Sequence, residues 1–188
     1  MNNKDQKRIF IRIPAADQIK SILPLLKSTI NCNPSHIKWI PPENIHLTLS
    51  FLGDVAVNKI PDIVQSVEQN ITTDQFQLSI SGTGVFSASK SPKVLWLDLN
   101  KGVDKLKLLH HQIEKSVSEF KDTHDKNIFI PHITVARIKQ TFRNIDVLAF
   151  LNSVYSTIDF DVNSISMYES KLLPEGTQYT IINTFPLN

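Results

Sequence analysis

Apolar residues recur along this chain with two spacings, one typical of strands and one typical of helices. Segments of the two kinds alternate along the sequence. Short β-rich or alternating runs predict strands over residues 9–13, 36–40, 45–52, 76–80, 94–99, 128–138, 160–168 and 179–185. Apolar positions three and four residues apart predict helices over residues 15–31, 57–69, 102–121 and 144–154, with Pro24 kinking the first helix or delaying its start. Because the sequence has no regular βαβ phosphate loop, we expect an α+β fold with antiparallel sheets.

The strand expected over residues 45–52 separates two kinds of side chain. Residues two apart in a strand face the same side. One face therefore carries His46, Thr48 and Ser50, and the other carries Ile45, Leu47, Leu49 and Phe51. This alternation predicts that Phe51 packs in the core, away from His46.

A four-residue pattern occurs twice on the expected strands. The first copy is His46-Leu47-Thr48-Leu49 and the second is His132-Ile133-Thr134-Val135. Each copy presents an imidazole and a hydroxyl on one face of its strand, with the aliphatic side chains on the other. The repetition indicates a duplicated half-fold with a pseudo-twofold axis between the motifs.

Two histidine–threonine pairs suit transfer at a phosphodiester. Two imidazoles on opposite sides of phosphorus can serve as general base and general acid, and two hydroxyls can donate to the non-bridging oxygens. Either motif alone would more often be an ordinary strand segment with a structural histidine. A zinc site is a weaker interpretation, because two histidines are a thin ligand set. The remaining histidines are expected to be structural or solvent-facing: His36, His110, His111 and His124.

The amino-acid composition limits the binding partners and the cellular compartment that we expect for this protein. Twenty Lys and Arg face 18 Asp and Glu, a net charge of +2, which is too weak a basic bias for a protein that wraps long nucleic acid. Cys32 is the one cysteine, so no intramolecular disulfide and no Cys-rich zinc site can form. The polar first residues and the lack of a membrane-length apolar run predict a cytoplasmic protein with no membrane contact.

The segments around both motifs resemble the two signatures of the 2H phosphoesterases. The resemblance is greatest to the RNA 2′,3′-cyclic phosphodiesterases, also called 2′-5′ RNA ligases. It rests on residues 39–53 (WIPPENIHLTLSFLG) and 131–137 (PHITVAR), with further matches over 8–11, 84–86, 91–97, 170–172 and 176–179. It implies one domain over residues 1–188, made of two pseudo-symmetric lobes. Each lobe is an antiparallel sheet backed by helices, and the active-site cleft lies between them.

The resemblance also implies an activity and a set of site residues. The activity is metal-independent opening of a terminal 2′,3′-cyclic phosphate to a 2′-phosphate, without a cofactor, and reversible 2′-5′ ligation is left open. The implied residues are the catalytic pair His46 and His132, the phosphate donors Thr48 and Thr134, the arginine Arg137 and, near the cleft, the aromatic Phe10. We assign His132 as base and His46 as acid, although the near symmetry leaves the order open. For Arg137, a surface salt bridge is the alternative. Residues 127–130 depart from the pattern, because they lack a basic residue common there.

Two other functions stay open on the sequence alone. One is a related phosphodiesterase acting on a 2′-5′ oligoadenylate or on ADP-ribose 1″,2″-cyclic phosphate, and the other is a non-catalytic module that binds RNA ends. The near-neutral charge favours an RNA 3′ terminus or a small cyclic nucleotide as the partner. Since one chain carries both motifs, we expect a monomer with no obligate protein partner.

Overall fold

The fold of this chain is known from a computed structural model that describes residues 5–88, 91–121, 128–139, 145–174 and 176–188. Its strands are β1 (Gln6–Pro14), β2 (Ile37–Trp39), β3 (His46–Ala56), β4 (Phe76–Ala88), β5 (Ser91–Lys101), β6 (Ile133–Ile138), β7 (Ile158–Val162), β8 (Ser164–Leu173) and β9 (Gly176–Pro186). Its α-helices are α1 (Ala16–Ile19), α2 (Leu23–Ser28), α3 (Ile60–Asn70), α4 (Val103–Val117) and α5 (Leu148–Leu151).

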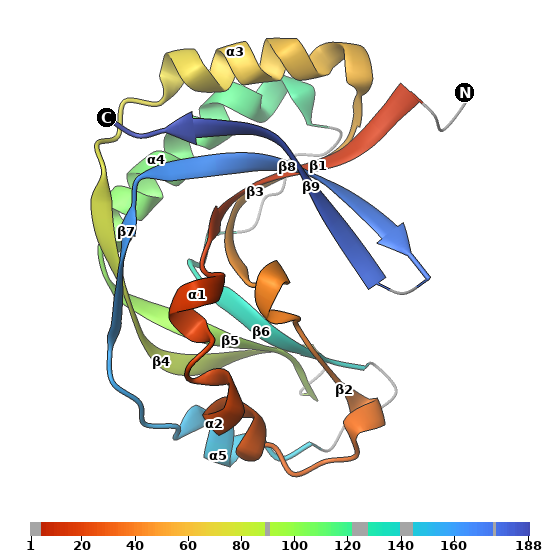
Figure 1. The fold of residues 1–188 in the computed structure, drawn as a ribbon, viewed down its shortest axis with the longest axis vertical. Coiled ribbons are helices and arrows are strands. Elements are labelled where there is room, and N and C mark those ends of the chain that lie inside the picture. Colours follow the sequence, from red (N-terminus) through yellow and green to blue (C-terminus); the bar gives the residue numbers. More distant parts are fainter. Residues whose placement is uncertain (1–4, 89–90, 122–127, 140–144, 175) are drawn as a thin grey trace.

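The strands form a curved antiparallel sheet whose two halves meet at the motif strands (Figure 1). Within the described ranges the strand order is β7-β4-β5-β6-β3-β1-β8-β9, with β2 on the edge of β6. β3 and β6 pair through Leu47 and Ile133, the residues that follow the two motif histidines. The predicted α+β class and antiparallel pairing are confirmed. The two expected sheets are the two halves of this sheet, joined at that point.

Two of the helices, α1 and α4, pack on the half of the sheet that does not contain the strand preceding them. α4 follows β5 and leads to β6, yet it packs on β3, and α3 lies beside it and reaches β9 (Figure 1). α1 follows β1 and contacts β7, and α5 contacts β4. The apolar face of α4, Leu106, Leu109 and Ile113, is fully buried in the core. This exchange ties the two halves together around the junction of β3 and β6.

Several elements differ in extent from the sequence prediction. The helix expected over residues 15–31 is divided into α1 and α2, and Pro24 lies in the first turn of α2, where its missing N–H costs no helical hydrogen bond. The strand expected over residues 160–168 divides into β7, which pairs with β4, and β8, which pairs with β1. β6 begins at Ile133 rather than at residue 128.

Two further elements are longer or shorter than expected. β4 and β5 extend beyond the strands expected over residues 76–80 and 94–99 and pair as one long hairpin. α5 spans fewer residues than the helix predicted over residues 144–154. His124 lies outside the described residues, as does Glu175 between β8 and β9.

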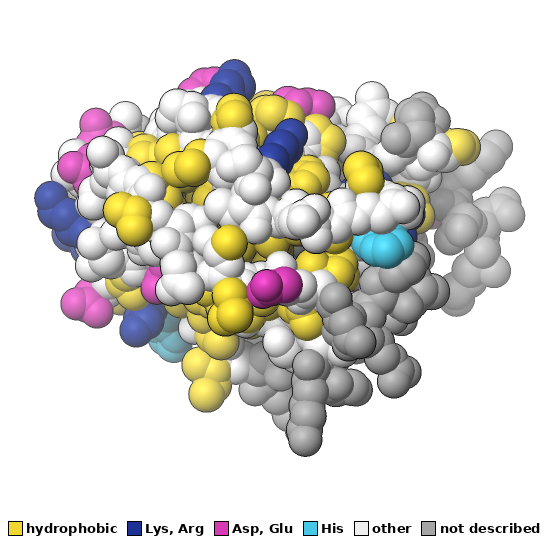
Figure 2. All heavy atoms as spheres, turned by 90° about the horizontal axis from the view of Figure 1, so that it is seen from below, with side chains coloured by type: hydrophobic (Ala, Val, Ile, Leu, Met, Phe, Trp, Pro, Cys, Tyr) yellow, Lys and Arg dark blue, Asp and Glu magenta, His cyan; other side chains and the backbone are white. Residues whose placement is uncertain are grey.

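The surface carries charges of both signs. Figure 2 shows one face, on which Lys and Arg side chains are dispersed among Asp, Glu and apolar residues rather than gathered into a single basic patch. Among the described residues, no helix has the length and apolar character needed to cross a membrane. The dispersed charge on this face agrees with the weak basic bias of the sequence.

Candidate active site

Both motifs face one cavity of about 380 Å³ at the junction of the two sheet halves. Its lining includes all the residues selected from the sequence: His46, Thr48, His132, Thr134, Arg137 and Phe10. The structure therefore brings together side chains that are more than 80 residues apart in the chain, since residue 132 is 86 positions beyond residue 46. Neither threonine hydroxyl has a hydrogen-bond partner among the described residues, so both are available to a ligand.

A β-bulge in each motif strand changes which residues face this cavity. On β3, Ile11 pairs with Ser50 and Arg12 pairs with Thr48, so Leu49 is an extra residue between them. An extra residue shifts the alternation by one position. The prediction that Phe51 packs in the core is therefore wrong: its side chain is 63 % exposed and lines the cavity on the same side as Thr48.

The same irregularity occurs in the second motif strand. Leu95 pairs with Ala136 and Trp96 pairs with Thr134, which leaves Val135 as the extra residue. The shifted alternation turns Arg137 onto the cavity side, where it is exposed and lines the lumen. No described carboxylate forms an ion pair with Arg137, so the salt bridge considered for it is not observed. Its guanidinium is free to hold a phosphate oxygen.

Each catalytic candidate is fixed by a hydrogen bond from its ring to the backbone two residues earlier. Nδ1 of His46 donates to the carbonyl oxygen of Asn44 at 2.6 Å, and Nδ1 of His132 donates to that of Ile130 at 2.8 Å. Because a carbonyl oxygen can only accept, Nδ1 must carry the proton in both rings. In the neutral tautomer Nε2 is then the basic atom of each ring, and it is the nitrogen through which both would act.

His46 lies in an aromatic pocket that also holds a buried cation. Its ring centroid is 5.3 Å from that of Phe10 and 5.6 Å from that of Tyr179. Nη1 of Arg12 approaches Nδ1 of His46 to 3.2 Å, and its guanidinium lies 3.8 Å from the centre of the Tyr168 ring. Arg12 is 5 % exposed, so its charge acts on His46 with little screening by solvent.

His132 has aromatic neighbours but no comparable buried cation. Its ring meets Phe86 edge-on at 4.8 Å between centroids and lies 6.1 Å from Trp96. Trp96 rests against Gly84, where an added Cβ would overlap the indole, so this glycine lets the ring lie flat on β4. The aromatic packing restricts the orientation of the imidazole without adding charge.

Both imidazoles hold their protons weakly in the free protein. The pKa of His46 is lowered to about 4, mainly by burial and to a smaller extent by the charges of Arg12, Arg137 and His132, against the opposing hydrogen bond to Asn44. Burial also lowers the pKa of His132, with a smaller contribution from the charge of Arg137. The two rings therefore stay neutral at neutral pH until a negatively charged ligand enters and raises the pKa of both.

Sequence reasoning missed several residues of this site. Arg12, Tyr179, Phe86 and Trp96 were not selected, although Arg12 lies two residues beyond Phe10 and so on the same face of β1. A single cation within the otherwise apolar run of residues 9–13 was an available signal. The aromatic residues come from β4, β5 and β9, and only the assembled sheet places them beside the motifs. Within the described ranges, no group of three or more His, Cys, Asp or Glu side chains is arranged to hold a metal ion.

Two histidine–threonine pairs that face one cavity suit chemistry on a phosphate ester. Comparison with known proteins shows the family of the chain. Residues 16–172 match the model of the 2′-5′ RNA ligase superfamily, and the chain belongs to that family. Its relatives include the RNA 2′,3′-cyclic phosphodiesterase of Aquifex aeolicus, 35 % identical with 80 % of this chain and 81 % of the relative covered. The same-named protein of Methanothermobacter thermautotrophicus is 28 % identical, with 96 % and 98 % covered.

Solved structures share the fold. A Thermus thermophilus crystal structure superposes with a TM-score of 0.78 at 24 % identity, covering 96 % of this chain and 97 % of that one. LigT of Escherichia coli, crystallised with 3′-AMP, gives 0.77 at 21 % identity, with 98 % and 99 % covered. These matches extend over nearly the whole length of both chains, so the overall fold is shared.

Proposed function

We propose that this chain is an RNA 2′,3′-cyclic phosphodiesterase that opens a terminal cyclic phosphate to a 2′-phosphate. The observation that carries the proposal is the pair of tethered imidazoles, each with a free threonine hydroxyl, on one cavity. The relatives from Aquifex aeolicus and Methanothermobacter thermautotrophicus carry this name. The substrate must be RNA rather than DNA, because a 2′,3′-cyclic phosphate needs a 2′ oxygen.

The reaction is an in-line displacement at phosphorus. One imidazole removes a proton from water through Nε2 as the water oxygen bonds to phosphorus. The bond from phosphorus to O3′ breaks on the opposite side, and the other imidazole gives its proton to O3′. The products are a 3′ hydroxyl and a 2′-phosphate, and before the next turnover the base releases its proton to solvent and the acid takes one up.

Three side chains stabilise the charge that develops on the phosphate. Thr48 and Thr134 donate from the two halves of the sheet to the non-bridging oxygens, where negative charge concentrates. The guanidinium of Arg137 donates hydrogen bonds to the phosphate in a bidentate arrangement. The proposed chemistry uses these groups and the two histidines, and no step needs a cofactor.

The assignment of acid and base is a separate part of the proposal. We keep His132 as the base and His46 as the acid for ring opening. In the free protein the charge of Arg12 works against a proton on His46. The assignment therefore requires the bound phosphate anion to raise the pKa of His46 enough for its ring to carry a proton.

The described lining of the site comes from one chain, and it supports a protein that acts as a monomer on short RNA ends. The few cations in the lining, Arg8 and Arg137, suit one terminal phosphate better than a long charged backbone. A cytoplasmic location, where RNA ends with cyclic phosphates are accessible, fits the same proposal.

Hydrolysis of a 2′,3′-cyclic mononucleotide, followed by ³¹P NMR, tests the proposed reaction. We expect the 2′-monophosphate as product with the wild-type protein and a nearly complete loss in His46→Ala and His132→Ala. His111→Ala is the matched control, because His111 is exposed on α4 and does not line the cavity. A 3′-monophosphate product, or full activity in either motif variant, would overturn the proposal.

A further inference from the structure

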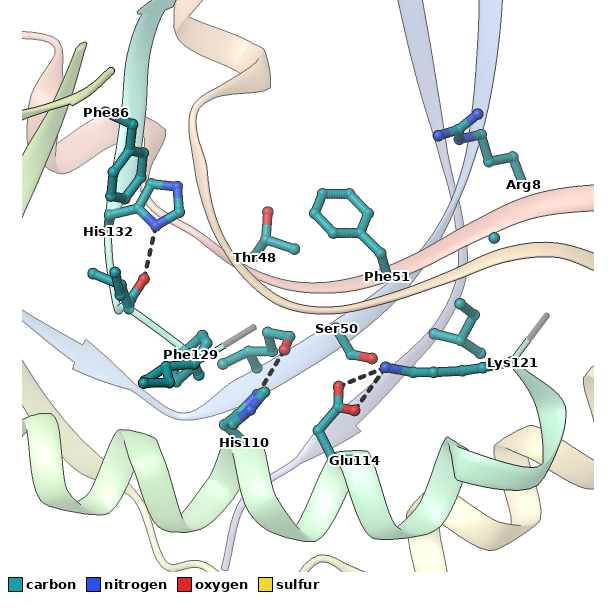
Figure 3. Close-up of a pocket in the computed structure, with 15 residues that line it drawn as sticks. Arg8, Thr48, Ser50, Phe51, Phe86, His110, Glu114, Lys121, Phe129 and His132 are labelled. Atoms are coloured by element: carbon teal, nitrogen blue, oxygen red, sulfur yellow. Dashed lines mark hydrogen bonds and ion pairs between the residues drawn. The ribbon is translucent and has the colours of Figure 1, made fainter. Parts of the chain in front are cut away.

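A second cavity, of about 600 Å³, adjoins the catalytic one and extends the cleft along β3 (Figure 3). The two cavities share Arg8, Thr48, Phe51 and His132, so a ligand whose phosphate lies between the motifs can reach into both. The volume lies within the range of about 300–1,000 Å³ common to sites for small organic ligands. Nothing in the two-histidine chemistry itself requires this extension.

The cavity exists because β3 and β6 separate immediately beyond their junction. β3 pairs with β6 at Leu47, and its following residues pair with β1 on the other side. The cavity is bounded by this edge of β3, by α4 and by residues 128–130. The sheet thus opens a gap directly beside the catalytic residues Thr48 and His132.

The floor of this cavity presents polar groups with unused hydrogen-bonding capacity. Ser50 is 4 % exposed, and its hydroxyl has no hydrogen-bond partner. Figure 3 shows this side chain directed toward the ion pair of Glu114 and Lys121. Nζ of Lys121 donates to the two carboxylate oxygens of Glu114 at 2.8 and 2.7 Å. An ammonium has three N–H groups, so one remains beyond the two given to Glu114.

The walls around this polar floor are aromatic. The rings of His110 and Phe129 are stacked at 3.8 Å between centroids, with 11° between their planes. His110 is held by a hydrogen bond from Nδ1 to the carbonyl of Leu49 at 2.8 Å. Phe51 and Phe86 line the side nearest the catalytic residues (Figure 3). A flat, polar-edged ligand fits such a cavity better than an aliphatic or a purely ionic one.

We propose that this second cavity binds the nucleobase of the terminal nucleotide and favours guanine or cytosine. Ser50 and Lys121 supply donors for a carbonyl oxygen, and the carboxylate of Glu114 accepts from an amino group. Guanine and cytosine each carry both a carbonyl oxygen and an amino group on their pairing edge. Adenine lacks the carbonyl oxygen and uracil lacks the amino group. The inference rests on the proposed function, since the catalytic cavity must hold the cyclic phosphate of the same nucleotide.

The test compares kcat/KM for the four 2′,3′-cyclic mononucleotides in the wild-type protein and in three variants. We expect the wild-type protein to prefer the guanine and cytosine substrates by about tenfold, the size of one or two lost hydrogen bonds. Ser50→Ala, Glu114→Gln and Lys121→Met should each reduce this preference through KM while kcat for the adenine substrate stays within about twofold. Ser50→Ala disturbs the fold least, so it keeps the test valid if an ion-pair variant unfolds.

Lys115→Met and Glu119→Gln are the matched controls, because both side chains are exposed near the same end of α4 and line neither cavity. They should leave the base preference unchanged. Equal kcat/KM for all four bases in the wild-type protein, or equal losses for all four in every variant, would overturn the base site while leaving the phosphodiesterase intact. If no cyclic nucleotide is hydrolysed, the proposed function fails. Calorimetric binding of the four nucleoside 2′-monophosphates then decides on the base site, by the same predicted order.

Discussion

The two motif strands, β3 and β6, are alike in their chemistry and different in their surroundings. Each has an extra residue after the motif threonine, and each fixes its histidine through Nδ1 to the carbonyl two residues earlier. Because the tether and the bulge are repeated, both imidazoles expose the same nitrogen to the cavity. The duplicated features are therefore those that a two-sided proton transfer needs.

The differences lie at two matching positions. Arg12 pairs with Thr48 on the neighbouring strand, whereas Trp96 pairs with Thr134. The residue five positions after the histidine, turned into the cavity by the bulge, is Phe51 in the first half and Arg137 in the second (132 + 5 = 137 and 46 + 5 = 51). In the proposed reaction the repeat places the two imidazoles symmetrically, while the buried charge of Arg12 near His46 and the exposed Arg137 near His132 make the two halves unequal.

Loss of either imidazole is expected to have the largest effect and to separate the two roles. His46→Ala and His132→Ala should each lower kcat by about 10²–10⁴-fold, the usual contribution of one proton transfer. A cyclic phosphate with sulfur in place of O3′ needs no proton on its leaving group. This substrate should restore most of the rate to the variant that lacks the acid, which we expect to be His46→Ala. Equal restoration in both variants would contradict a division into acid and base.

Substitution of either motif threonine should lower kcat by a similar factor, because the two motifs are equivalent. Thr48→Val and Thr134→Val each remove one donor to the developing charge, and kcat should fall by up to about 10²-fold while the melting temperature changes little. The control for shape is Thr→Ser at each position, which keeps the hydroxyl and should retain most of the rate. A loss as large as that of the histidine variants would show that the hydroxyls do more than donate.

Arg137 and Phe51 occupy equivalent positions in the two motif strands, and substitutions at these positions should have unequal effects on KM. Arg137→Ala removes a charged hydrogen-bond donor to the phosphate, so KM should rise by roughly 10–100-fold. Phe51→Ala removes an uncharged surface, and its KM should rise only a few-fold. Steady-state kinetics at fixed pH measure KM for both variants and so distinguish the two effects. Similar effects of both changes would mean that the two positions after the bulges have equivalent roles.

Arg12 should have the smallest effect on the rate and a directional effect on the pH profile. Its positive charge disfavours the imidazolium form of His46, so Arg12→Met should raise the pKa of His46 and leave that of His132 nearly unchanged. Arg12→Lys keeps the charge and should keep the pKa of His46 low. Titration of both rings by NMR measures these values, and an unchanged pKa of His46 in Arg12→Met would contradict a role for the charge.

The sequence was most informative where function depends on short, repeated patterns. The His-x-Thr repeat required only the period-two geometry of a strand, and the structure places both copies on one cavity. The helical periodicity likewise predicted α3 and α4, because long amphipathic faces are local features. Phe10, selected from the resemblance, lies against the ring of His46.

The features that the sequence did not predict depend on contacts between segments that are far apart in the chain. Strict alternation placed Phe51 in the core, since a bulge arises from the pairing of β3 with β1 and leaves no clear mark in β3 alone. The division of residues 160–168 into β7 and β8 depends on which strands lie beside them. The environment of His46 likewise combines Arg12 and Tyr179, which are contributed by opposite ends of the chain.

The most direct test of the account is the reaction of an RNA that ends in a 2′,3′-cyclic phosphate, carried out in excess EDTA with the product isomers separated. The account predicts conversion to the 2′-phosphate by the wild-type protein, at a rate that EDTA does not change, and no conversion by His46→Ala or His132→Ala. A 3′-phosphate product, a rate abolished by EDTA, or conversion by either variant at the wild-type rate would contradict the two-histidine mechanism.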